Sequence, residues 1–430
     1  MNLFYGKNKD FKLSIFKSKL FWIVMVLKLL AGLFFASPFL KNLFYPFIDF
    51  FVHSDVISTY KEFYSSGRGN SFPYPVIMLY VVSSCKLFFS NNGILSFLDI
   101  ALIRVPILLA DLSILVVFSR WLKTNHRPLI YLYWLNPVLF YINYLHGQLD
   151  VIPTAFLIVS LYFLFKNNWV LNAIFIVLAI LSKTNFILVL PFLVIYMAKS
   201  DNFNFKKIIF SISLILILLV TLQLPLIFDN AYLSMVYNNE TQGKFLNLFI
   251  NYDPLNNLKL FVSPAIILIL IFYGISFRNF NKNLFILFLS FCFATISLLT
   301  PPSQGWYYWF IPFFIYFLIK DSTKNSKLFY WSFVLAYFIY FSIIPSSDFL
   351  NLYLFTSNPN NYTLYNLLPL SVINKNLIVN ISFTFLQITL FINCVLILVR
   401  GIEFYKKNKL LYQPFLIGVG GDSGSGKTTF

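Results

Sequence analysis

The sequence predicts an all-α polytopic membrane protein with roughly twelve transmembrane helices, followed by the start of an α/β domain. Its 430 residues are 59% hydrophobic and only 11% charged, whereas soluble domains carry roughly 25% charged residues. Apolar runs of the ~20 residues that cross a bilayer recur from Leu20 to Arg400. Lys and Arg lie in short clusters between these runs, so the net charge of +17 indicates topology signals and no nucleic-acid-binding face.

The first apolar run begins at Leu20, after a lysine-rich start. Residues 1–19 are therefore predicted to be cytoplasmic, because basic flanks stay inside. The run is too long for the core of a signal peptide and lacks a small-residue cleavage pattern. We expect it to be a retained span.

Residues 37–99 are predicted to form an external loop. Within it, "YPVIMLYVVSSCKLFF" is apolar, but it is short, has proline at its start and is interrupted by Lys86. If this stretch were a span, Arg120, Lys123 and Arg127 would lie outside, whereas an interfacial helix leaves them inside. We therefore predict an interfacial helix.

If this stretch is not counted as a span, the remaining basic clusters all lie in the cytoplasm. Residues 20–400 then form one transmembrane domain within the lipid bilayer. We expect a multi-pass protein of a bacterial inner (plasma) membrane, with both termini cytoplasmic. The predicted spans after the first lie near residues 100–119, 129–145, 151–165, 169–182, 184–198, 208–227, 260–276, 283–299, 307–320, 328–345 and 377–399.

The external loop carries two candidate catalytic residues, Asp49 and Asp55, followed by "FPYP". A carboxylate at the membrane surface can act as a general base, or as a metal ligand, on a substrate that arrives from lipid. The alternative is that both are solvated loop carboxylates.

Two further external turns carry polar side chains beside the bilayer. "LHGQLD" places His146, Gln148 and Asp150 in one turn, where Gly147 permits a tight backbone. Such a turn suits hydrogen bonding to a polyol or a phosphate, although any polytopic protein has polar turns. Lys183 in "LSKTN" is an external cation, against the positive-inside pattern. It can pair with a lipid phosphate or simply extend to the headgroups.

One predicted span carries two charges, Arg104 and Asp111, at i and i+7. They lie on the same helical face, about 10 Å apart along the axis. Because intramembrane charges usually face the protein interior, we expect each to form an ion pair with another helix. Further on, "TPPSQGWYYWFIPFF" contains aromatic residues that fit either an interfacial belt or a sugar-stacking surface.

Taken together, these segments resemble the GT-C superfamily of membrane glycosyltransferases, in particular the branch with the GPI- and dolichol-linked mannosyltransferases and their bacterial relatives. The resemblance covers most of Leu20 to Arg400 and depends on the order and outward placement of its parts. The parts are the loop with Asp49 and Asp55, "FPYPVIMLY", "RVPILLADL", "HGQLD" and "PPSQGWYYWFIPF".

The resemblance implies transfer of a hexose, such as mannose, from a polyprenyl-phosphate donor to a glycan or lipid acceptor, with inversion. It implies a first-loop carboxylate as the base, Asp49 first and Asp55 second, and often a divalent metal. This loop has no adjacent acidic pair, which is a departure from the family. Because polyprenyl phosphate is a good leaving group, a base plus cations that hold the phosphate would suffice. Lys183 and Arg104 are the candidate cations.

The chain closes on a nucleotide-binding pattern. "GDSGSGKT" matches the Walker A motif, and "FLIGVG" before it predicts the buried strand that the motif requires. The backbone would wrap the phosphates of ATP, Lys427 would reach the outer phosphates, and Thr428 would hold Mg²⁺. The predicted nucleotide-binding residues are Gly421, Asp422, Ser423, Gly424, Ser425, Gly426, Lys427, Thr428 and Thr429.

This final stretch resembles the uridine kinase and phosphoribulokinase family. We assign residues 401–413 to a cytoplasmic linker and 414–430 to the beginning of a P-loop kinase domain. This stretch has too few residues to bury a core. We therefore expect the chain to be the front part of a longer fusion protein, cut just after its Walker A motif.

Two alternative functions stay open. A transporter or lipid-linked-sugar flippase predicts inverted repeats and helices broken near the middle of the bilayer. We find no repeat, and the polar residues gather at the external face, which favours an enzyme. A membrane-anchored kinase of the uridine kinase type would need one span for anchoring and not a dozen.

Overall fold

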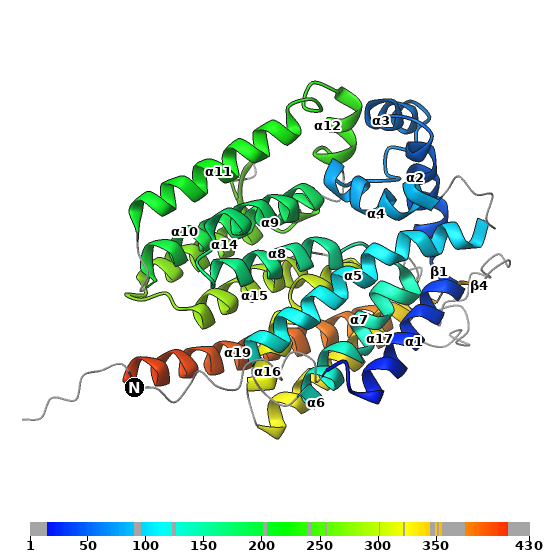
Figure 1. Cartoon of the computed structure of the whole chain (residues 1–430). Helices are drawn as coiled ribbons and strands as arrows, with labels where there is room; N and C mark the ends of the chain where they lie inside the picture. Colours follow the sequence, from blue (N-terminus) through cyan, green and yellow to red (C-terminus); the bar gives the residue numbers. More distant parts are fainter. Residues whose placement is uncertain are drawn as a thin grey trace, which may run out of the picture.

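The computed structural model shows a chain that is helical almost throughout (Figure 1). The predicted nucleotide-binding loop lies outside the part of the chain that the structure describes. The described residues are 15–89, 96–122, 126–200, 204–239, 243–253, 256–300, 302–320, 323–344, 349–350, 352–354 and 375–411.

Within the described residues, five helices are long and apolar enough to cross a membrane. Their candidate membrane-crossing parts lie in α5 (Ser96–Leu122), α11 (Phe205–Gln223), α15 (Lys282–Leu299), α17 (Lys324–Ile343) and α19 (Lys375–Leu411). The class predicted from the sequence, an α-helical protein with apolar spans, is confirmed at this level.

Shorter apolar helices fill much of the space between them. α8 and α9 pack side by side, and their bounds agree with the predicted spans within a residue. Because a 14-residue helix is about 21 Å long, it is shorter than a hydrocarbon core of about 30 Å. The set comprises α1 (Lys19–Phe34), α8 (Val151–Leu164), α9 (Trp169–Ser182), α10 (Val189–Lys199), α14 (Val262–Ser276) and α16 (Ile311–Lys320).

The predicted span 129–145 is not one helix. It consists of α6 (His126–Leu129), the π-helix η4 (Ile130–Trp134), α7 (Pro137–Phe140) and the π-helix η5 (Tyr141–His146). The break has a local cause, because Asn136 accepts hydrogen bonds from the N–H groups of Val138 and Leu139 and so starts a new helix.

The helices predicted to lie in external segments gather at one end of the bundle, at the right of Figure 1, while the C-terminal end of α19 lies at the other. A two-residue strand, β1 (Phe35–Ala36), pairs with β4 (Tyr353–Leu354) at this end. The hairpin of β2 (Phe249–Asp253) and β3 (Leu258–Phe261) leads into α14. The helices of the predicted external segments are η2 (Phe39–Phe44), α2 (Tyr45–Val52), α3 (Val56–Ser65), α4 (Val76–Phe89) and α12 (Asn230–Val236).

The three remaining helical pieces are short 3-10 turns. η6 (Thr184–Leu188) precedes α10 and η8 (Gln304–Trp309) precedes α16, so both corresponding predicted spans begin with a tighter turn. η7 (Lys244–Leu246) lies before the hairpin. η8 matters for the site because it carries buried aromatic side chains into the centre of the bundle.

Candidate functional site

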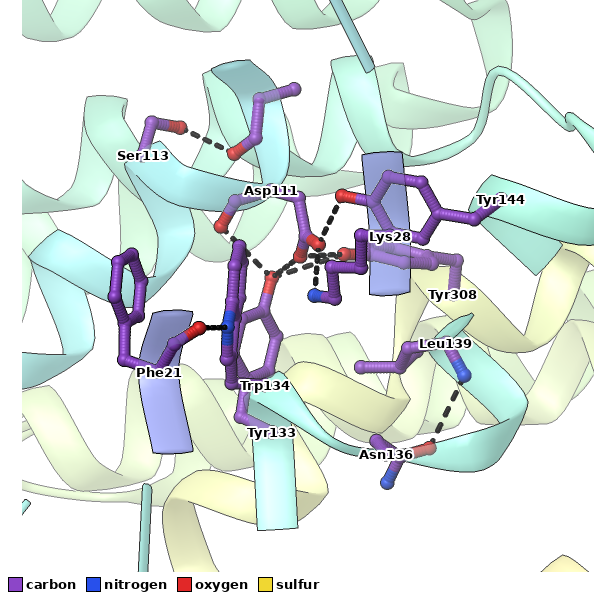
Figure 2. A network of polar contacts seen from close by, with 11 residues as sticks. Phe21, Lys28, Asp111, Ser113, Tyr133, Trp134, Asn136, Leu139, Tyr144 and Tyr308 are labelled. Atoms are coloured by element: carbon purple, nitrogen blue, oxygen red, sulfur yellow. Dashed lines mark hydrogen bonds and ion pairs between the residues drawn. The ribbon is translucent and has the colours of Figure 1, made fainter. Parts of the chain in front are cut away.

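A buried ion pair joins the first helix to α5. Lys28 of α1 contacts Asp111 of α5 at 2.7 Å, and both side chains are 2% exposed. Figure 2 shows three tyrosine side chains pointing at the same carboxylate. Tyr133 and Tyr308 donate to Asp111 Oδ1 at 2.6 and 3.0 Å, and Tyr144 donates to Oδ2 at 2.7 Å.

This network satisfies both partners of the pair. Lys28 Nζ also lies 3.2 Å from the centre of the Trp134 ring, which stabilises the cation. The predicted interhelical ion pair of Asp111 is confirmed. Its partner Lys28 was not predicted from the sequence. A single lysine inside an apolar run was the signal that could have identified it as a member of an intramembrane ion pair.

The same expectation was wrong for Arg104. Its guanidinium donates to the backbone carbonyls of Asn143 at 2.6 Å and Phe35 at 2.9 Å, and within the described chain it has no carboxylate partner. Its Nε has no hydrogen-bond partner there, and the side chain is buried. The guanidinium packs against Gly147, whose φ of 86° is in the left-handed region. Carbonyl groups stabilise the buried cation without neutralising it.

Arg104 lines a cavity of about 280 Å³ between α1 and α5. Most of its wall is apolar, and part of that wall, including Leu29 and Phe89, is exposed on the outside of the bundle. The wall residues with ionisable or phenolic side chains lie among these apolar residues. The lining consists of Lys28, Leu29, Gly32, Leu33, Phe89, Asp99, Ala101, Leu102, Arg104, Val105, Leu108 and Tyr144.

A cluster of two carboxylates and one ammonium stands at the end of this cavity. The Lys86 ammonium contacts the Asp49 carboxylate and lies 3.5 Å from Asp99 Oδ2. Tyr45 donates a hydrogen bond to the same Asp99 oxygen at 3.3 Å. Lys86 is 1% exposed, so the predicted external loop folds its own cation inward against Asp49. Asp99 did not figure among the predicted site residues, and only the fold shows that it belongs to the cluster.

Asp55, the second predicted base, has a structural role. It precedes α3 and accepts hydrogen bonds from the backbone N–H of Ser58 at 2.8 Å and from the Ser58 hydroxyl at 2.7 Å. These two hydrogen bonds lower the pKa of the exposed Asp55 carboxyl. A carboxylate with a lowered pKa is a weaker base, and the geometry therefore favours Asp49 over Asp55.

The polar turns predicted from "HGQLD" and "LSK" meet in a second cluster. The Lys183 ammonium contacts the Asp150 carboxylate, and Trp309 Nε1 donates to Asp150 at 2.8 Å. The Lys183 ammonium lies 4.7 Å from the centre of the Trp309 ring and 5.1 Å from that of Tyr74. The "FPYP", "HGQLD", "LSKTN" and "SQGWYYW" segments thus meet at this cluster. Lys183 is thus paired with a carboxylate, whereas Arg104 has no carboxylate partner among the described residues.

The other two predicted binding residues lie beside this cluster. His146 is buried, and its backbone carbonyl accepts a hydrogen bond from the Ser37 hydroxyl at 2.7 Å. Its ring packs between Phe39 and Tyr141. A Cβ on Gly305 would lie 3.1 Å from Gln148 Cγ and 2.2 Å from an Asp150 oxygen, so η8 approaches this turn closely.

A divalent metal does not fit the described carboxylates well. Among the described residues, no group of three or more His, Cys, Asp and Glu side chains could hold a metal ion. Between Asp49 and Asp99 the Lys86 ammonium already occupies the place that a cation would take. We therefore derive no step through a metal.

The fold and these clusters define a helical protein with candidate membrane-spanning helices and a polar site at one end of its bundle. No protein-family model, curated protein or solved structure matches the chain.

Proposed function

We propose that this protein is an integral-membrane glycosyltransferase, which moves a hexose from a polyprenyl-phosphate donor to a glycan or lipid acceptor at the external face. The cavity between α1 and α5 carries this proposal, because it combines apolar walls with Arg104 and Asp99. A ligand suited to it has an apolar chain and an anionic head. A lipid phosphate has both.

The cavity residues match the parts of such a donor. The exposed apolar side chains Leu29 and Phe89 suit the lipid chain. Arg104 makes one hydrogen bond from each of its two terminal nitrogens, so other donors of its five remain for a phosphate oxygen. A carboxylate of the Asp49–Lys86–Asp99 cluster would take the proton of the acceptor hydroxyl.

The proposed localisation is a multi-pass protein of a bacterial inner membrane, with both termini cytoplasmic. The gathering of α2, α3, α4 and α12 at one end of the bundle supports one external face that holds both polar clusters (Figure 1). The Walker A pattern within residues 414–430 agrees with this orientation, because it would bind ATP with Mg²⁺ on the cytoplasmic side.

The test is transfer of radiolabelled mannose from undecaprenyl phosphate to endogenous acceptors in membranes that contain this chain. We expect transfer to fall more than tenfold in Asp49→Asn. It should persist in Asp55→Asn, because asparagine caps a helix as well as aspartate does, and in Lys427→Ala, because the transferase works without the nucleotide loop. Equal transfer by wild type, Asp49→Asn and membranes without the chain would contradict the proposal.

The break in the helix between residues 126 and 146 is the observation that favours a transporter instead, since broken helices form transport sites. In a transporter, however, the free N–H groups at such a break face the substrate. Here Asn136 occupies two of them, and its amide nitrogen lies 2.5 Å from the hydroxyl of Tyr330. Labelled lipid-linked mannose that crosses the membrane without transfer would establish the transporter.

A further inference from the structure

The Lys86 ammonium lies beside two carboxylates, and only one of the two lines the cavity. Asp99 lines the cavity together with Arg104, whereas Asp49 does not line it. The Asp49 side chain is 44% exposed and the Asp99 side chain 23% exposed. Of the two, Asp99 is therefore the one placed beside a ligand in the cavity.

The two oxygens of Asp99 have different surroundings. Oδ2 accepts the hydrogen bond of Tyr45 at 3.3 Å and lies 3.5 Å from Lys86. Oδ1 has no hydrogen-bond or ion-pair partner among the described residues. One oxygen thus holds the carboxylate in place, and the other is available to an incoming hydroxyl.

Charge balance in the cluster also leaves one carboxylate able to accept a proton. Two carboxylates share a single ammonium, so the ammonium compensates one negative charge. Asp49 makes the direct contact with Lys86, and Asp99 is the more distant partner. The uncompensated charge lies at the carboxylate that lines the cavity.

We propose that Asp99 is the proton acceptor of the transfer reaction and that Asp49 is a positioning residue that acts through Lys86. This inference rests on the proposed glycosyltransferase function. The acceptor hydroxyl gives its proton to Asp99 Oδ1, and its oxygen forms a bond to the anomeric carbon. The bond from that carbon to the phosphate oxygen breaks, and its electron pair leaves with the polyprenyl phosphate beside the Arg104 guanidinium.

The assignment differs from the one that the first-loop resemblance implied. Asp49 lies in α2, within the predicted external loop, whereas Asp99, the last residue of that predicted loop, lies in α5, the same helix that carries Arg104. Residues 99 and 104 are five positions apart, about 7.5 Å along a helix axis. Both side chains line the cavity, so the proton acceptor and the phosphate-binding cation would lie on opposite sides of the anomeric carbon.

The experiment compares single-turnover transfer of mannose from undecaprenyl phosphate, from about pH 3 to pH 8, a range that covers the titration of an ordinary carboxyl group, with binding of the same donor. We expect Asp99→Asn to lower the transfer rate about 10²- to 10⁴-fold, the range of a general base, with donor affinity within threefold of wild type. The acidic limb of its pH–rate profile should disappear. Asp49→Asn should lower the rate less and keep a shifted acidic limb. Glu62→Gln, an exposed carboxylate change in α3, serves as the control.

Two outcomes would overturn the assignment. One is an Asp99→Asn rate within tenfold of wild type, and the other is loss of the acidic limb in Asp49→Asn and not in Asp99→Asn. If Asp99→Asn does not fold, Asp99→Glu replaces it, which keeps a carboxylate and should retain the limb at a reduced rate; a limb lost in Asp99→Glu would also contradict the proposal. Absence of transfer by the wild-type protein would reject the proposed function itself, which is a different result.

Discussion

Gly147 holds the backbone of the "HGQLD" turn against the guanidinium of Arg104. Its φ of 86° is one that side chains disfavour, and a Cβ there would lie 2.8 Å from an Arg104 nitrogen and 2.9 Å from Leu40 Cδ2. Gly67 has a similar φ of 73°, but a Cβ on it would meet nothing within 4 Å. The two glycines therefore separate backbone strain from contact with Arg104 and Leu40.

We predict that Gly67→Ala costs about 1 kcal/mol of unfolding free energy, from strain alone. Gly147→Ala should cost roughly 2–3 kcal/mol, because the guanidinium must also leave the carbonyls of Phe35 and Asn143. Unfolding of both variants in detergent micelles measures the difference, and donor binding should weaken in Gly147→Ala alone. Equal losses would show that Arg104 moves aside freely.

The Lys28–Asp111 pair allows a second prediction at this scale. In Asp111→Asn the buried Lys28 loses its counter-charge, and an uncompensated buried charge costs roughly 3–5 kcal/mol. In Lys28→Met the Asp111 carboxyl keeps three tyrosine hydroxyls, so we expect a loss of about half that size.

A double-mutant cycle on chemical unfolding checks this. The double variant Lys28→Met/Asp111→Asn should be no less stable than Asp111→Asn, because it no longer buries an unpaired ammonium. A double variant whose loss equals the sum of the two single losses would show that the ion pair contributes no coupling energy.

At the scale of elements, the sequence predicted the helices whose formation depends on local pattern. α9 begins and ends where its apolar run does, since Asn168 caps its first turn and the run stops at Lys183. The break near Asn136 has a local signal, an asparagine cap followed by Pro137, but the apolar run across it predicts one span. Asp99 could not be identified from the sequence, since only folding brings it to Lys86.

These two asparagines provide the next prediction. Asn136→Ala removes the acceptor for Val138 and Leu139 and a buried contact to Tyr330, so we expect a loss of roughly 2–3 kcal/mol. Asn168→Ala removes one exposed cap bond, to Leu171, and should cost about 0.5–1 kcal/mol. Thermal unfolding of the two variants gives the comparison. A smaller loss for Asn136→Ala would mean that the interrupted helix does not depend on its cap.

At the scale of the whole molecule, orientation depends on whether α4 crosses the membrane. Its 14 residues span about 21 Å, less than a hydrocarbon core of about 30 Å. It contacts α2, α5 and α9, and it buries Lys86 against the carboxylates of the site. If α4 lies at the interface, the loop before it and the end of α14 lie on opposite sides. If α4 spans the bilayer, every later segment changes side.

Two matched serines decide between these topologies. Ser66 and Ser276 are both exposed, and each hydroxyl donates to the carbonyl three residues earlier. In a background with Cys85, Cys292 and Cys394 changed to Ala, we predict that a membrane-impermeant maleimide labels Ser66→Cys on intact cells. Ser276→Cys should react only after permeabilisation. Labelling of both on intact cells would make α4 a span. Labelling of Ser276→Cys alone would turn the carboxylate cluster toward the cytoplasm, and a transferase of the external face could then not use it.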